Sequence, residues 1–345
     1  MELTTFWFGL IAVLWIGYFV LEGFDFGVGM LLPVVSRDEQ DRQVVLRSIG
    51  PVWDGNEVWL LVAGGATFAA FPEWYASLFA GFYLPLLVIL VALIVRGIAL
   101  EYRGKLADAT WRKRWDLAIT VSSAVPALLW GVAFANIVRG VAMDRSHVVT
   151  ASFWSLLNPY ALLGGVVTLV LFGLHGAVFL ALKTDGGVRR RSRAVATQLG
   201  AVAVVGGAAF LLWTQVAHGR GWTWVTAVLA AGCLIAGVAA NLRGREGWAF
   251  TATALTLALV VVTLFGDLWP NVLPSTTSDA NSLTVTAAAS SAYTLKVMSW
   301  VAVTATPVVL AYQAWTYWVF RQRLVRTEPA IPGQRPPSDT PVPVR

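Results

Sequence analysis

The 345-residue sequence has few charged residues. Asp, Glu, Lys and Arg make up only 13% of it, whereas 57% of the residues are hydrophobic and the mean hydropathy is +0.67. Soluble globular domains carry about 25% charged residues. The composition therefore excludes a soluble globular domain and indicates a polytopic membrane protein of the all-α class.

Cysteine and histidine are also scarce. Cys233 is the only cysteine and lies in an apolar segment, which excludes a disulfide framework and a cysteine metal site. Of the three histidines, only His175 falls inside an apolar segment, and no methionine forms an obvious pair with it. Heme iron needs such ligands, so we expect no heme or metal bound by this chain. We interpret His175 as an interior residue hydrogen-bonded across helices.

Apolar runs of about 20 residues, the length that crosses a bilayer, recur along the chain. We expect nine such helices, near residues 5–33, 51–71, 75–100, 115–138, 156–182, 194–216, 222–241, 247–268 and 293–320. The first has no basic leader and is interpreted as a spanning helix rather than a signal peptide. Residues 1–326 should form the membrane domain. Residues 327–345 hold six prolines and are predicted to be a disordered cytoplasmic tail.

The distribution of basic residues predicts the orientation. Most of the 25 Lys and Arg residues lie in the loops after the first, third, fifth and seventh predicted spans and in the tail. The opposite side has only Arg139, Arg145 and Arg220. By the positive-inside rule, the N-terminus lies outside and the C-terminus lies in the cytoplasm. The same rule explains the basic cluster at 189–193 as a topology signal and a contact for anionic lipid, so nucleic-acid binding is not expected.

Four carboxylates lie in the first two predicted spans: Glu22 and Asp25 in one, Asp54 and Glu57 in the other. Each costs roughly 2.5–3.5 kcal/mol near a bilayer centre unless it is paired, protonated or hydrated. Residues three apart share a helix face, so both pairs are expected to point inward. All four lie in the predicted cytoplasmic half, which suits a proton inlet. The alternatives are headgroup contacts at helix ends or neutralisation of Arg96.

Gly23 and Gly27 are four residues apart on either side of Asp25. Small residues at this spacing let a second helix approach closely. Close packing alone is the simplest interpretation of this pair, and an interface with a partner subunit is the functional one.

Several segments carry a resemblance to a known family. They are GFDFGVGML at 23–31, PVWDGNEVWLL at 51–61, GGATFAAFPEWYA at 64–76, GFYLPLLVILVALIVRGIALEYRGK at 81–105, LLNPYALLGGVV at 156–167 and SLTVTAAASSAYTLKVMSWVAV at 282–303. Over nearly the whole chain apart from the tail, the sequence resembles subunit II of cytochrome bd quinol oxidases.

The resemblance implies nine helices, arranged as two four-helix bundles plus one peripheral helix, in the bacterial cytoplasmic membrane. It implies a heterodimer with a similarly built subunit I, which holds hemes b558, b595 and d and the site of quinol oxidation. Subunit II itself holds no heme. The quinone is menaquinone or ubiquinone, and a structural quinone or lipid and a small single-helix accessory subunit are further partners that the resemblance allows.

The resemblance also implies a proton route past acids that match Asp25 and Asp54. Trp53, Asn56 and Glu57 flank Asp54 in this chain, and Glu22 and Arg96 are the remaining candidates. We expect an electrogenic, non-pumping oxidase that takes protons for water from the cytoplasm. A proton-coupled secondary transporter is the alternative, although the acids cluster in one hairpin rather than in two related halves. A purely structural scaffold is a third hypothesis.

Overall fold

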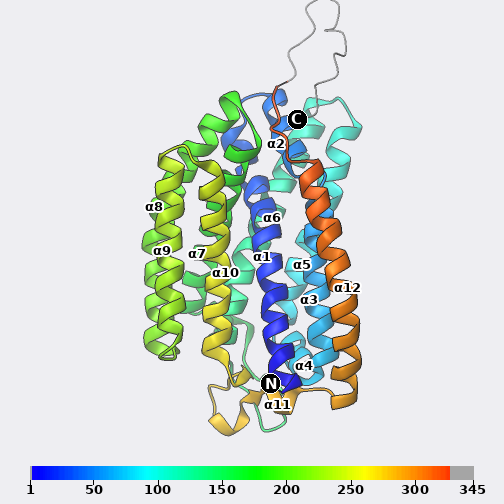
Figure 1. Cartoon of the computed structure of the whole chain (residues 1–345), viewed down its shortest axis with the longest axis vertical. Coiled ribbons are helices and arrows are strands. Elements are labelled where there is room, and N and C mark those ends of the chain that lie inside the picture. Colours follow the sequence, from blue (N-terminus) through cyan, green and yellow to red (C-terminus); the bar gives the residue numbers. More distant parts are fainter. Residues whose placement is uncertain (1, 327–345) are drawn as a thin grey trace, which may run out of the picture.

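Helix α1 (Leu3–Val35) runs through the middle of the helical bundle (Figure 1). The computed structural model describes residues 2–326, so the predicted disordered tail at 327–345 lies outside the described residues. Every residue from 22 to 29 of α1 is buried. A helix that is covered on all sides is a core element. Its neighbours are α3 (Trp53–Ala70), α6 (Ala109–Arg139), α7 (Pro159–Lys183) and α10 (Glu246–Leu268).

The long helices form two groups of four. In the first group, α1 packs on α3 and α6, and α6 packs on α5 (Tyr83–Tyr102). In the second group, α7, α8 (Gly186–Ala217), α9 (Thr223–Leu242) and α10 pack in a closed ring. Helix α12 (Ala292–Val319) lies at the edge against α1 and α3, with only Leu295 buried. The predicted all-α membrane fold is confirmed.

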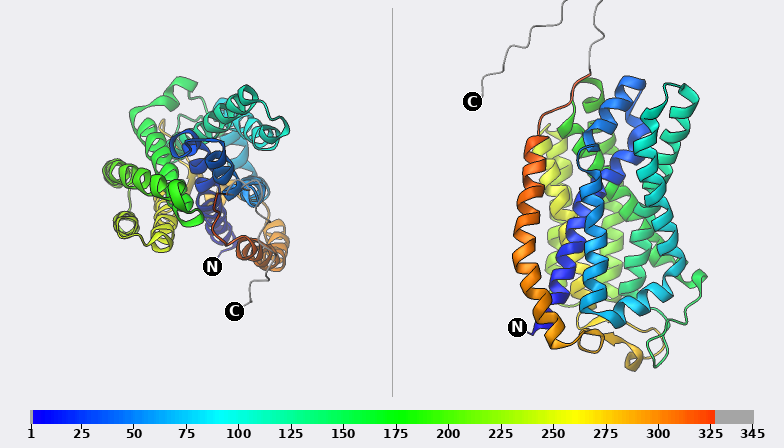
Figure 2. Two further views of the ribbon diagram at one scale, coloured as in Figure 1. Left: turned by 90° about the horizontal axis from the view of Figure 1, so that it is seen from above. Right: turned by 90° about the vertical axis from the view of Figure 1, so that its right-hand side faces the viewer.

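Eight helices in residues 2–326 are long and apolar enough to cross a membrane: α1, α5 to α10 and α12. Helix α3, the second predicted span, is not among them, because Asp54, Asn56 and Glu57 lower its mean hydropathy. Its 18 residues still extend about 27 Å. Nine crossings therefore remain a prediction. The start of α1 and the end of α12 lie at opposite ends of the bundle (Figure 1 and Figure 2), which supports it, because only an odd number of crossings separates the two ends.

Three features of the helices differ from the sequence prediction. The third predicted span divides at Phe82 into α4 (Pro72–Gly81) and α5, and Pro72 at the start of α4 ends α3. An additional short amphipathic helix, α2 (Glu39–Ile49), follows α1 at the predicted cytoplasmic end. Helix α8 begins at Gly186, so the basic cluster at 189–193 lies on a helix rather than in a loop.

The long segment after α10 closes the opposite end of the bundle. It contains β1 (Asn271–Leu273), β2 (Leu283–Thr284), α11 (Val285–Ala288) and a single 3-10 turn at Asp279–Asn281. β1 and β2 pair antiparallel, and Asn281 donates a hydrogen bond to the Met143 carbonyl at 2.9 Å. This segment and the loop after α6 therefore cover the end of the bundle near α4. Two further 3-10 turns, at Arg103–Lys105 and Phe153–Leu157, lie after α5 and before α7.

Candidate functional site

Glu22 and Asp25 form the centre of a buried charged cluster. Both are completely buried on α1, and so is Arg96, which reaches them from α5. Arg96 Nη1 donates a hydrogen bond to Glu22 Oε1 and lies 3.8 Å from Glu57 Oε2 on α3. Its guanidinium also lies 4.9 Å from the centre of the Phe26 ring. The prediction that the acidic face of α1 points inward is confirmed.

The face of α3 that carries Asp54 was predicted to point inward as well, and this prediction is wrong. Asp54 is exposed in the first turn of α3, where its Oδ1 accepts a hydrogen bond from the Gly55 amide at 2.8 Å. Leu61, two turns further on, is 71% exposed. The small and amide residues of α3 face α1 instead, because Asn56, Ala63 and Thr67 allow closer packing. The Asp54 face is thus free for contact outside this chain.

Glu57 lies between the exposed Asp54 and the buried cluster. Its side chain is 24% exposed, and it shares Arg96 with Glu22. Glu57 and Asp54 are three residues apart and lie on the same side of α3. The second predicted pair therefore spans the boundary between the protein interior and its surface.

Asn56 connects α1, α3 and α12. Its Nδ2 donates to Asp25 Oδ2 at 2.7 Å, and its Oδ1 accepts from the Tyr317 hydroxyl at 2.7 Å and from Gln313 Nε2 at 3.3 Å. Asn56 was predicted from the sequence to lie beside the acids, whereas Gln313 and Tyr317 were not predicted. The signal was available, since two polar residues four apart in an apolar span lie on one helix face.

Several buried polar atoms of this cluster have no hydrogen-bond partner within residues 2–326. They are Glu22 Oε2, Asp25 Oδ1, Arg96 Nε and Nη2, and the hydroxyl of Ser123 on α6. Buried polar atoms in proteins are almost always paired with protein groups or ordered water. The interior between α1, α5 and α6 thus has donors and acceptors that can hydrogen-bond to water.

Trp53 lies at the start of α3 and faces α5. A Cβ atom added at Gly97 would meet the Trp53 ring at 3.5 Å, which is ordinary van der Waals contact. Gly97 follows Arg96 directly, so Trp53 packs beside the arginine that joins the acids. The contact that the structure shows for Trp53 is therefore van der Waals packing.

Gly23 and Gly27 do not lie at a surface. Both are buried against α7 of the same chain: a Cβ at Gly23 would lie 2.8 Å from the Phe172 ring, and one at Gly27 would lie 2.8 Å from the Gly176 Cα. The prediction that this pair contacts a partner subunit is therefore wrong, and close packing explains it. Gly176 completes the contact from the facing helix, which sequence spacing on α1 could not show.

His175 is buried between three helices, as expected. Its Nε2 lies 3.1 Å from the Val20 carbonyl oxygen, and its Nδ1 lies 2.7 Å from the Thr253 hydroxyl. Because a carbonyl only accepts, Nε2 donates to it. The ring stacks on Phe250 with 4.7 Å between the ring centres. Both nitrogens are thus engaged in links among α7, α1 and α10.

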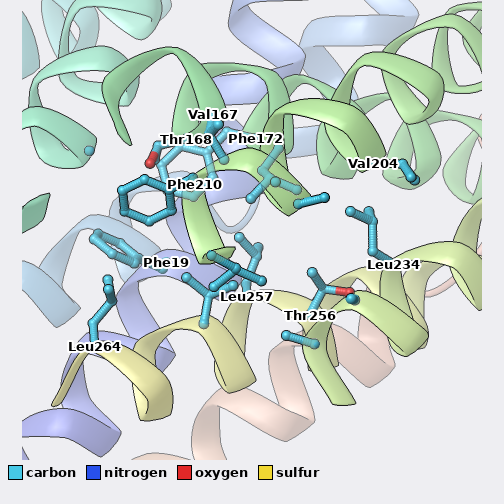
Figure 3. Close-up of a pocket in the computed structure, with 18 of the residues that line it drawn as sticks. Phe19, Val167, Thr168, Phe172, Val204, Phe210, Leu234, Thr256, Leu257 and Leu264 are labelled. Carbon is cyan, nitrogen blue, oxygen red and sulfur yellow. The ribbon is translucent and has the colours of Figure 1, made fainter. Parts of the chain in front are cut away.

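An apolar cavity of about 110 Å³ lies in the second helix group, beside α1 and α6 (Figure 3). No charged residue lines it. The hydroxyls of Thr168 and Thr256, its only polar lining side chains, donate to the carbonyls of Gly164 and Ala252 at 2.9 Å. Cavities with such linings hold apolar groups rather than water. The cavity suits a hydrocarbon chain, and its chemistry is unrelated to that of the acid cluster.

An ion-pair group lies at the predicted cytoplasmic end, close to α2. Arg103 pairs with Glu39 at 2.9 Å and with Asp116 at 2.5 Å, and Arg112 lies 3.3 Å from Glu39. Partial burial raises the pKa of Glu39, but the hydrogen bonds and charge of Arg103 and the charge of Arg112 outweigh it, so the net pKa is lower than usual. This group fixes α2 to the ends of α5 and α6.

Among residues 2–326, no three His, Cys, Asp or Glu side chains are grouped to hold a metal ion. The candidate site therefore consists of protonatable side chains, one arginine and amide or hydroxyl groups.

Comparison with known proteins finds relatives that match almost the whole chain. The chain is 40% identical over 328 residues to cytochrome bd ubiquinol oxidase subunit 2 of Bacillus subtilis, covering 94% of this chain and 97% of that protein. It is 35% identical over 360 residues to cytochrome bd-I ubiquinol oxidase subunit 2 of Escherichia coli, covering 93% and 95%. These relatives give no support to the transporter alternative.

A solved structure shares the fold. A chain of the bd oxidase from Geobacillus thermodenitrificans superposes with a TM-score of 0.73 at 17% identity, covering 92% of this chain and 97% of that one. The profile of the family described as cytochrome bd terminal oxidase subunit II matches residues 3–320. The protein studied here is therefore a member of the cytochrome bd terminal oxidase subunit II family.

Proposed function

We propose that this chain conducts protons from the cytoplasm toward the partner subunit of a bd-type quinol oxidase and binds no heme itself. One observation carries the proposal: Glu22, Asp25 and Arg96 are completely buried inside a membrane bundle and are connected to the surface through Glu57 and Asp54. Ionisable groups at such depth are expensive and mark ion or proton pathways.

The order of exposure suggests a route. Asp54 is exposed at the mouth, Glu57 is half-buried one turn deeper, and Glu22 is fully buried beyond Arg96. Asp25 lies on α1 one turn nearer the predicted cytoplasmic end than Glu22 and is linked to α3 through Asn56. A proton taken up at Asp54 would pass to Glu57 or Asp25 and then inward to Glu22, with water at the unpaired polar atoms completing the path.

The remaining parts of the reaction belong to the complex. In our proposal, subunit I holds hemes b558, b595 and d and oxidises quinol, either menaquinol or ubiquinol, at the outer side of the bacterial cytoplasmic membrane. Electrons cross to heme d, where dioxygen is reduced to water with protons from inside. Charge is then separated without a pump. The N-terminus lies outside and the C-terminus inside, as the distribution of basic residues predicts.

The outer face of α3 and α5 is the surface we assign to subunit I. It exposes large apolar side chains together with Asp54: Val58, Leu61, Val62, Leu84, Val88, Val91 and Ile94. With the partner on this face, a proton that has entered the carboxyl groups between α1, α3 and α5 reaches subunit I without crossing lipid. The apolar cavity of the second group would take a quinone tail or an acyl chain, and the exposed α12 would take a single-helix accessory subunit.

Asp25→Asn tests the proposal. Asparagine keeps the shape of the side chain and accepts the Asn56 hydrogen bond through its carbonyl oxygen, but it cannot bind and release a proton. We expect assembled complex with full heme content and quinol-driven oxygen uptake per heme d reduced roughly a hundredfold, the usual effect of losing a proton-transfer group. Asp54→Asn should have a smaller effect, because water at the exposed mouth can replace it.

Glu73→Gln is the matched control, since Glu73 is an exposed acid at the opposite end of the bundle. Its uptake should equal that of the unmodified protein. Normal turnover in Asp25→Asn would remove this carboxyl from the proton path, and loss of assembly on native gels would make it a structural residue.

A further inference from the structure

A chain of hydrogen bonds joins the peripheral helix α12 to the buried Asp25. Trp59 Nε1 donates to Gln313 Oε1 at 2.9 Å, and Gln313 Nε2 donates to Asn56 Oδ1 at 3.3 Å. The Tyr317 hydroxyl donates to the same oxygen at 2.7 Å. Asn56 Nδ2 then donates to Asp25 Oδ2 at 2.7 Å. The chain crosses from α3 to α12, back to α3 and on to α1.

The donor-to-acceptor direction of these hydrogen bonds follows from the chemistry of Trp59, where they begin. An indole N–H can only donate, so the amide group of Gln313 must turn its oxygen toward Trp59. The nitrogen of Gln313 consequently faces Asn56, which must offer its oxygen there. Tyr317 adds a second donor to that oxygen. The amide nitrogen of Asn56 is therefore left to face Asp25.

This orientation determines which form of Asp25 is stabilised. A hydrogen bond donated to a carboxylate favours its ionised form. If the Asn56 amide were reversed, its oxygen would face Asp25 and only a protonated carboxyl could donate to it. Reversal would set the Asn56 amide nitrogen against the Gln313 amide nitrogen, two donors facing each other, and the Tyr317 hydroxyl would have to accept a hydrogen bond instead of donating one. Helix α12 thus influences the protonation of a residue that it does not contact through a hydrogen bond.

Gln313 and Tyr317 differ from the rest of α12. The helix is exposed along most of its length, and Leu295 is its only buried residue. Gln313 and Tyr317 are half-buried, lie four residues apart and point to one face. Side chains with hydrogen-bonding groups are costly in a span unless they are paired. Their placement opposite Asn56 satisfies this requirement and accounts for two polar positions that packing alone does not need.

We propose that Gln313 and Tyr317 are positioning residues for proton transfer at Asp25, because they hold the Asn56 amide in the orientation that donates to this carboxyl. The inference rests on the proposed proton-conducting role. The other titratable or charged groups that face Asp25 are Glu22 on α1, Glu57 on α3 and Arg96 on α5. The substitutions below leave these three residues unchanged.

The test uses the complete oxidase complex with Gln313→Leu and Tyr317→Phe combined. Two quantities are measured between pH 5 and pH 9: quinol-driven oxygen uptake per heme d, and the infrared carbonyl band of protonated Asp25, which Asp25→Asn identifies by its loss. We expect the band to persist to about one pH unit higher than in the unmodified complex, as loss of an oriented hydrogen bond to a charged group implies. In the plot of oxygen uptake against pH, the part where uptake rises should move to higher pH by a similar amount.

Tyr312→Phe is the matched control. Tyr312 lies on the same helix, is 66% exposed, and its hydroxyl has no hydrogen bond within residues 2–326. Removal of this hydroxyl should move neither the band nor the profile. A merely structural role for Gln313 and Tyr317 would lower the amount of complex without changing the pH dependence of what remains.

The outcomes separate this inference from the proposed function. If Asp25→Asn abolishes uptake but the double variant shows an unchanged band and profile, the positioning role is wrong and the proton path stands. Full uptake in Asp25→Asn would instead remove Asp25 from the proposed proton path, and the positioning role with it. If the double variant does not assemble with hemes, Gln313→Leu alone, which removes the group that orients Asn56, is measured in the same way. A band shift of about half the size is expected, and none would overturn the inference.

Discussion

The two groups of four helices have similar architecture but different interiors. The first group, α1, α3, α5 and α6, encloses two carboxylates and an arginine that are completely buried. The second group, α7 to α10, encloses an apolar cavity lined by aliphatic and aromatic side chains, with threonines that satisfy their own helix carbonyls. Two groups of four helices thus have two kinds of core. In our proposal the proton chemistry belongs to the side chains of the first group, because only that group encloses ionisable residues that are completely buried.

Helix α1 belongs to both interiors. One face presents Glu22 and Asp25 to the charged cluster, and another presents Gly23 and Gly27 to α7. The close approach at Gly27 and Gly176 fixes the rotation of α1, and so fixes where the acids point. The second group therefore supports the first without taking part in its chemistry.

The largest effect is expected where a charge loses its partner. Arg96→Gln leaves Glu22 buried without a counter-charge, and breaking a buried ion pair costs roughly 3–5 kcal/mol. We expect little assembled complex on native gels. Combining Arg96→Gln with Glu22→Gln removes both charges and should restore much of the assembly, but not oxygen uptake. Poor assembly in the double variant would mean that Arg96 stabilises the fold by contacts other than this pair.

A smaller effect is expected in the apolar group. Leu257 lines the cavity and is 4% exposed, so Leu257→Ala enlarges an existing space and should cost about 2–5 kcal/mol. Thermal unfolding in detergent should begin at lower temperature, while oxygen uptake per heme d stays normal. Loss of turnover in the complex that does assemble would contradict the division between a chemical and a supporting group.

The smallest effect is expected at the ion pairs near α2. The pKa of Glu39 is below its ordinary value, so its stabilising contribution is present above the unfolded-state pKa of about 4.3 and is lost as the pH falls through the folded-state pKa. The Glu39 side chain is 34% exposed, so water and salt screen its pairs, and screened pairs contribute about 0.2–1 kcal/mol. Glu39→Gln should therefore lower the unfolding temperature slightly at pH 7 and leave it unchanged in strong acid. Glu101→Gln, at an exposed acid on α5, is the control and should not change the unfolding temperature at pH 7 or in strong acid.

Much of this molecule followed from the sequence. Apolar runs predicted the membrane class and most of the helices, because only a helix of about 20 apolar residues satisfies its backbone in lipid. The spacing of Glu22 and Asp25 predicted an acidic face of the first helix that points inward, which the structure shows, and the motifs around WDGNEVW identified the family. These features are local or compositional, so they can be read along the chain.

Tertiary structure decided which neighbour each residue meets. Periodicity shows that Asp54 and Glu57 share a face of α3, but the rotation of α3 depends on Asn56, Ala63 and Thr67 fitting against α1. Periodicity also could not show that Gly27 meets Gly176, or that Asn56 receives hydrogen bonds from residues more than 250 positions away in the sequence. Contacts between helices depend on the shape and hydrogen-bonding capacity of two surfaces at once, and a pattern along one helix describes only one of them.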